Sequence, residues 1–186
     1  MRLAINLLTD EPANPPWAHG GGTRTFPDPH TDLGRRQLIV LEPPRDKTCT
    51  AELRALADEL GIAADVVWVG EVPLEETATF YRCTDVFAYP SYNETIGLPI
   101  LEAMASGCPV VTSDVTSMPE VAGGAALLAG PEDEQALADA LLNACGPEAD
   151  RLRAAAGLER AAEFMWARTA ERRLEVFREV YAGRNR

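Results

Sequence analysis

Hydrophobic residues along the 186-residue chain recur in two patterns that alternate from about residue 37 onward. Short runs rich in Val, Ile and Leu indicate buried strands, and longer segments with apolar residues three and four positions apart indicate amphipathic helices. The predicted strands are 3–8, 37–41, 66–70, 86–90 and 109–114, with a further apolar run at 125–129. The predicted helices are 50–60, 74–83, a helix from Pro99 to Gly107, 117–122, 132–145, 148–163 and 167–182.

This alternation predicts an α/β fold with a Rossmann-like parallel sheet and helices on both of its faces. Residues 37–186 would form one such domain, while residues 1–36 hold a short strand followed by a segment rich in Pro, Gly, Asp and Thr. That composition is typical of an irregular linker. Phe164 and Trp166 bracket the boundary between the last two predicted helices, and we expect them to pack there.

The net charge of the chain limits the kinds of molecule that it can bind. The net charge is −12, and Lys47 is the one lysine among 17 basic residues. A chain this acidic is a poor partner for nucleic acid or for an anionic membrane. No apolar run approaches the roughly 18 residues of a membrane-spanning helix, and the first residues do not resemble a signal peptide. We therefore expect a cytoplasmic protein whose anionic ligands are held by arginines, backbone N–H groups and helix ends.

The segment YNETIGLPILEAMASGCPVV, residues 92–111, carries the candidate chemistry. Glu94 and Glu102 lie eight positions apart around Gly97 and Pro99, where a loop leads into a helix. A helix N-terminus attracts phosphate, and glycine lets a ligand approach the backbone closely. Since carboxylates repel phosphate, the two glutamates would accept hydrogen bonds from hydroxyl groups on either side of it. A nucleotide sugar, with sugar, diphosphate and ribose, has this layout.

A purely structural interpretation of the same residues also exists. Glutamate near a helix N-terminus is favourable by about 0.3–1 kcal/mol without any ligand, because it complements the helix dipole. The spacing of Glu94 and Glu102 therefore does not by itself establish a binding site.

The same segment resembles the signature of family-four glycosyltransferases of the GT-B fold. That signature is Glu, seven residues, Glu, with Gly and Pro between, then Ala-x-Ala-x-Gly-x-Pro-Val. Here it is matched in order by Glu94, Gly97, Pro99, Glu102, Ala103, Ala105, Gly107, Pro109 and Val110. The similarity covers about residues 37–182 and is specific for the C-terminal, donor-binding domain of these enzymes.

The resemblance implies a retaining glycosyltransferase that uses a nucleotide sugar and needs no metal or other cofactor. Glu94 would contact the donor sugar at the catalytic centre, and Glu102 the ribose hydroxyls. The remaining implied contacts are backbone groups for the sugar and diphosphate at Ile96, Gly97 and Leu98, and a turn beside the base at Gly70 and Val72. Arg45 and Lys47 follow the strand 37–41 and lie on the correct side for the diphosphate, although a plain solvated loop explains them too.

The chain also departs from the family pattern. It is about half the length of a complete two-domain enzyme, and residues 1–36 resemble only a remnant of the acceptor domain. The first strand and helix of the donor domain, which bring Arg and Lys to the diphosphate, are not evident. Arg24, Arg45 and Lys47 are possible substitutes. Because orienting two reactants is worth about 7–11 kcal/mol, we expect little turnover from this chain alone.

Two readings of function remain open from the sequence. One is a glycosyltransferase whose missing half comes from a partner or a homodimer, acting on an unknown acceptor. The other is a non-catalytic module with the same fold that binds a nucleotide sugar or serves as an interaction surface.

Overall fold

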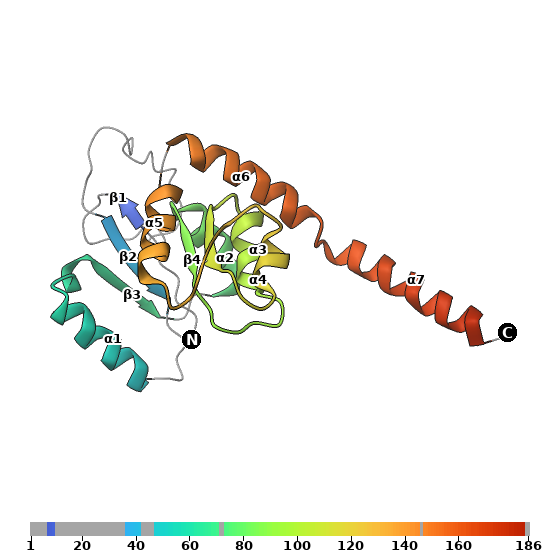
Figure 1. The fold of residues 1–186 in the computed structure, drawn as a ribbon, viewed down its shortest axis with the longest axis horizontal. Coiled ribbons are helices and arrows are strands. Elements are labelled where there is room, and N and C mark those ends of the chain that lie inside the picture. The colour runs from blue at the N-terminus through green and yellow to red at the C-terminus, as the bar shows by residue number, and fades with distance from the viewer. Residues whose placement is uncertain (1–6, 10–35, 42–46, 71–72, 146, 185–186) are drawn as a thin grey trace.

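The computed structural model describes residues 7–9, 36–41, 47–70, 73–145 and 147–184 (Figure 1). The strands are β1 (Leu7–Thr9), β2 (Arg36–Leu41), β3 (Val66–Gly70), β4 (Phe87–Tyr89), β5 (Val110–Ser113) and β6 (Leu127–Ala129). The α-helices are α1 (Lys47–Glu59), α2 (Leu74–Arg82), α3 (Leu98–Ala105), α4 (Met118–Ala122), α5 (Glu134–Ala144), α6 (Pro147–Ala162) and α7 (Trp166–Arg184). From β2 onward, the predicted elements are confirmed to within three residues at each end.

The strands pair into two three-stranded sheets, β1-β2-β3 and β4-β5-β6. The pairs β2–β3, β4–β5 and β5–β6 are parallel, which confirms the predicted α/β class. β1 instead pairs with β2 in the antiparallel direction, a feature that the sequence pattern did not predict. β2 is therefore the central strand of the first sheet, with β1 on one side and β3 on the other.

Helices cover both faces of the second sheet, as the alternation of side chains along its strands requires. Phe87 and Tyr89 of β4 face a large core that includes Ile100 and Met104 of α3. Val86 and Val111 face the opposite way, into a smaller core with the alanines of α5. Ile39 of β2 is also buried in the larger core, so the two sheets share one apolar interior. Packing on both faces holds β4 and β5 in place, and the loops that follow them start from these fixed strands.

Helix α7 differs from the other helices because it extends away from the body beyond α6 (Figure 1). Trp166, at its start, is 78% exposed. The expectation that this side chain packs at the helix boundary is therefore wrong. Phe164 lies under the guanidinium of Arg160, with 4.7 Å between Cζ and the ring centre. None of the described helices is long and apolar enough to cross a membrane.

Candidate functional site

The start of α3 is built by a glycine in a left-handed conformation. Gly97 has φ 75° and precedes the first helical residue, and Pro99 lies in the first turn, where no N–H is needed. A Cβ added at Gly97 would lie 3.1 Å from Cδ1 of Ile100, which is fully buried. Both the backbone angle and the close contact favour glycine here. The loop of residues 91–97 leads from the end of β4 into this turn.

The loop carries Glu94 in a defined position. The phenolic hydroxyl of Tyr89 donates a hydrogen bond to Oε1 of Glu94. The backbone N–H of Glu94 donates to Oγ1 of Thr116 at 3.3 Å, and its carbonyl accepts from the hydroxyl of Ser117 at 2.9 Å. Thr116 itself has φ 54°, an uncommon conformation for a residue other than glycine. The loop after β5 therefore holds Glu94 by its main chain, and Tyr89 holds its side chain.

These three anchoring residues were not predicted from the sequence. Tyr89 is only 2% exposed and belongs to the core through its ring, as an apolar strand suggests. Its hydroxyl, however, reaches the loop beyond the strand end. A tyrosine as the last residue of a buried strand is the one signal that could have suggested this, since a buried phenol needs a hydrogen-bond partner. Thr116 and Ser117 gave no comparable signal.

Glu102 lies within α3 and its side chain is exposed. In the described part of the chain, its carboxylate forms no hydrogen bond or ion pair, and no arginine pairs with Glu94. Ile96 and Leu98 are about half exposed on either side of Gly97. Among the described residues, a ligand that binds either carboxylate would therefore break no ion pair.

The other predicted contacts are only partly placed. Gly70 ends β3 and pairs with Leu41 of β2, next to a shift in the strand register. Lys47 is the first residue of α1, which follows the carboxyl end of β2. Arg45 and Val72 lie outside the described residues. Of the predicted site, the structure therefore describes the two glutamates and the start of α3, while Arg45 and the side chain of Lys47 lie outside what it describes.

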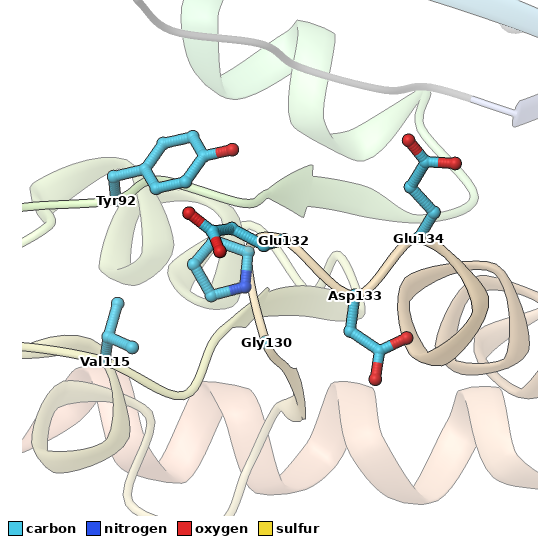
Figure 2. Close-up of a pocket in the computed structure, with 7 residues that line it drawn as sticks. Tyr92, Val115, Gly130, Glu132, Asp133 and Glu134 are labelled. Carbon is cyan, nitrogen blue, oxygen red and sulfur yellow. The ribbon is translucent and has the colours of Figure 1, made fainter.

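A cavity of about 740 Å³ lies beside this loop, at the carboxyl ends of β5 and β6. Figure 2 shows its lining, which consists of Tyr92, Val115, Gly130, Pro131, Glu132, Asp133 and Glu134. Three consecutive acidic residues make it unfavourable for a diphosphate, which is itself negatively charged. Asp133 also has a structural role, because its carboxylate accepts from the N–H of Ala136 at 2.9 Å and caps α5. The described residues contain no group of three or more His, Cys, Asp or Glu suited to a metal ion.

Known proteins share the segment that builds this site. The profile of the family described as "Glycosyl transferases group 1" matches residues 36–146. The O-antigen chain mannosyltransferase B of Escherichia coli is 39% identical over 112 residues, which are 60% of this chain and 29% of that protein. The chain spans well under half the length of the curated relatives that it matches.

Solved structures extend the similarity to the fold. The C-terminal domain of a glycosyl transferase group 1 family protein from Francisella tularensis matches with a TM-score of 0.57 and 27% identity, covering 65% of this chain and 64% of that one. The Anabaena protein HepE in complex with UDP-glucose matches with a TM-score of 0.61 and 22% identity, covering 67% of this chain and 35% of that one. The second likeness concerns the fold alone. With a family match over more than half its residues, the chain belongs to the group 1 glycosyltransferases, and its fold is that of their GT-B C-terminal domains.

Proposed function

We propose that the chain is the donor-binding domain of a retaining glycosyltransferase and that it binds a nucleotide sugar at the start of α3. The observation that carries the proposal is the anchored loop. Glu94 is held at the carboxyl end of β4 by Tyr89, Thr116 and Ser117, directly before a helix N-terminus. A fixed acceptor of hydrogen bonds directly before a helix N-terminus supports the proposal that a diphosphate binds at that helix start.

Each part of the ligand has a matching group. The diphosphate oxygens accept from the N–H groups of Ile96, Gly97 and Leu98 at the positive end of the helix dipole. Glu94 accepts from hydroxyls of the donor sugar, and Glu102 from the two ribose hydroxyls. Hydroxyl groups that donate to a carboxylate form charge-assisted hydrogen bonds, which are stronger than neutral ones. The two carboxylates repel the diphosphate, and their hydrogen bonds to the neutral sugar and ribose hydroxyls offset this repulsion.

Turnover requires an acceptor held against the donor. The chain spans 29% of the mannosyltransferase B relative and 38% of a D-inositol 3-phosphate glycosyltransferase from Corynebacterium glutamicum. Orientation of the two reactants contributes about 7–11 kcal/mol to catalysis, and this contribution depends on both being bound. The second candidate function is a non-catalytic module that binds a nucleotide sugar. Donor binding is common to both candidates.

Isothermal calorimetry with UDP-, GDP- and ADP-sugars tests donor binding. UDP-glucose is the first probe because HepE, which shares the fold, was solved with it. We expect binding that Glu102→Ala weakens by roughly ten- to a hundredfold, since a hydrogen bond to a charged group is worth about 1.5–3 kcal/mol. Glu159→Ala is the matched control, because Glu159 is an exposed glutamate within α6.

Four outcomes would each reject one of the candidate functions or the donor site. Absence of binding to any of the three donors, or equal losses in the Glu102 and Glu159 variants, would reject the donor site. Release of free nucleotide or transfer to an added acceptor would reject the non-catalytic module. If binding occurs without either reaction, the module is the better description of this chain alone.

A further inference from the structure

Arg160 of α6 holds the C-terminal end of α4 by two hydrogen bonds to its backbone. Its Nε donates to the carbonyl of Val121 at 3.0 Å, and its Nη2 donates to the carbonyl of Glu120 at 2.6 Å. The carbonyls on either side, at residues 119 and 122, accept from backbone N–H groups. All four carbonyls are therefore satisfied, and a positive charge lies at the negative end of the helix dipole.

The guanidinium of Arg160 is also held on its other sides. Its Nη1 forms an ion pair with the carboxylate of Glu163, and its Cζ lies 4.7 Å from the ring centre of Phe164. Only 21% of the Arg160 side chain is exposed. A planar guanidinium fixed in this way donates to two carbonyls with little further loss of side-chain freedom. Arg160 is therefore a rigid connection between α6 and the end of α4.

The opposite end of α4 is the segment that anchors Glu94. Ser117 precedes the helix, and Ser117 and Thr116 both hydrogen-bond to the backbone of Glu94. The hydroxyl of Thr116 also donates to the sulfur of Met118, the buried first residue of α4. With five residues, α4 is roughly 7.5 Å long and too short to be stable as an isolated helix. Its position, and that of the Glu94 anchor, depends on its contacts with the core and at its ends.

α6 also packs directly on α3, the helix whose start carries the proposed donor site. A Cβ added at Gly157 would lie 3.2 Å from Cγ and 3.6 Å from Cα of Met104, which is a buried residue of α3. The two helices therefore cross closely. Gly157 and Arg160 are three positions apart and share one face of α6. That face contacts α3 at Gly157 and α4 at Arg160, so it links the start of α3 to the segment that anchors Glu94.

We propose that Arg160 is a positioning residue for the donor sugar and that it acts through α4 on the placement of Glu94. The inference rests on the donor site proposed above. Removing the guanidinium removes the donors of two carbonyls and frees the end of α4, so that the Glu94 carboxylate is no longer fixed relative to the start of α3. The effect is specific to the sugar, which Glu94 binds. The diphosphate and the ribose are bound by other groups.

Calorimetry with UDP and with UDP-glucose separates this role from a general loss of stability. UDP lacks the sugar, so the difference between the two affinities isolates the contact of Glu94. We expect Arg160→Ala to weaken binding of UDP-glucose about three- to tenfold, part of the effect of a complete hydrogen bond to a charged group, and to leave binding of UDP unchanged. Arg160→Lys keeps a charge and a donor near the carbonyls and should recover part of the loss. Arg153→Ala is the matched control, because Arg153 of the same helix donates to the carbonyl of Asn143 in α5 at 3.0 Å.

A second pair of variants displaces the guanidinium without removing it. A Cβ at Gly123 would overlap Nε of Arg160 and lie 2.8 Å from its Cζ. Gly123 and Gly124 both have positive φ angles, of 55° and 84°, but a Cβ at Gly124 would meet no atom within 4 Å. An alanine is strained at both positions. Gly123→Ala should therefore reproduce the loss of sugar binding, and Gly124→Ala should not.

Amide spectra of the ligand-free, ¹⁵N-labelled chain distinguish failure of this inference from failure of the donor site. We expect Arg160→Ala to shift the amide resonances of Glu94 and Ser117, which Arg153→Ala leaves in place. Unchanged resonances would overturn the inference, as would equal losses of UDP and UDP-glucose binding or unaltered binding of UDP-glucose in Arg160→Ala. A wild-type chain that binds neither ligand would reject the donor site and with it the role of Arg160 in sugar binding, while the shifts would still show that Arg160 positions Glu94.

Discussion

Replacing Gly97 by alanine tests whether the left-handed turn before α3 is required for both stability and donor binding. Gly97 has φ 75°, and Gly107, at the other end of the same helix, has φ 77°. A Cβ at Gly107 would meet no atom within 4 Å, whereas one at Gly97 would lie 3.1 Å from Cδ1 of Ile100. An alanine at either position would carry the same cost of a left-handed backbone conformation. The two positions differ in how closely a Cβ would contact its neighbours and in how far they lie from the proposed site.

The expected losses of stability follow from these contacts. An alanine in the left-handed region costs about 1–2 kcal/mol, and this is the whole cost at Gly107. At Gly97 the methyl group also presses on Ile100, whose buried side chain has little room to move, so the total reaches about 2–3 kcal/mol. For a chain of this size each kcal/mol lowers Tm by roughly 2–4 °C. If the backbone at residue 97 moved to relieve the strain of the added methyl group, the N–H groups of residues 96–98 would turn away from a bound diphosphate.

Urea unfolding and calorimetry with UDP-glucose measure the two effects separately. We expect Gly97→Ala to lose more stability than Gly107→Ala and to bind the donor about tenfold or more weakly, because a hydrogen bond to a charged oxygen is lost. Gly107→Ala should bind the donor as the wild type does. The reasoning is refuted if both variants bind equally well, or if Gly97→Ala is as stable as the unmodified chain.

Two further predictions concern side chains of the domain body. Tyr89→Phe keeps the buried ring and removes the hydroxyl that donates to Glu94, so we expect a loss of about 1–2 kcal/mol in urea unfolding and weaker donor binding. The exposed Tyr92 supplies the control Tyr92→Phe, and equal unfolding midpoints for the two variants would contradict the anchoring role. Burial raises the pKa of the Cys83 thiol, so at about pH 8 less of it is thiolate than in the unfolded chain. Mass-resolved alkylation should be slower at Cys83 in the folded chain than in urea, and an equal rate would contradict this.

The parallel strands and their helices could be predicted because their signals are local. The apolar run at 66–70 depends only on neighbouring residues, and the structure places β3 at Val66–Gly70. The antiparallel pairing of β1 with β2 could not be predicted in this way, since strand pairing depends on segments distant in sequence. Trp166 was expected to pack because it lies at the boundary between the last two predicted helices, but it is exposed on a helix that extends from the body (Figure 1).

The candidate site could be predicted in part for the same reason. Gly97 and Pro99 were predicted at a helix start from a contiguous pattern, and the structure places Gly97 directly before α3 and Pro99 in its first turn. The roles of the two glutamates remain predictions. The hydrogen bonds of Glu94 to Thr116 and Ser117 join residues 22 and 23 positions apart, and no local pattern indicates them. The roles of Arg45, Lys47 and Val72 remain predictions, because the structure does not describe their side chains.

The most direct test of the account is a titration of the ¹⁵N-labelled chain with UDP-glucose, followed by backbone amide chemical shifts. The account predicts the largest shifts at Ile96, Gly97 and Leu98, with Gly107 at the far end of α3 nearly unchanged. Shifts concentrated at residues 130–134 would show that the acidic cavity takes the ligand. That result would contradict a diphosphate seated at the start of α3.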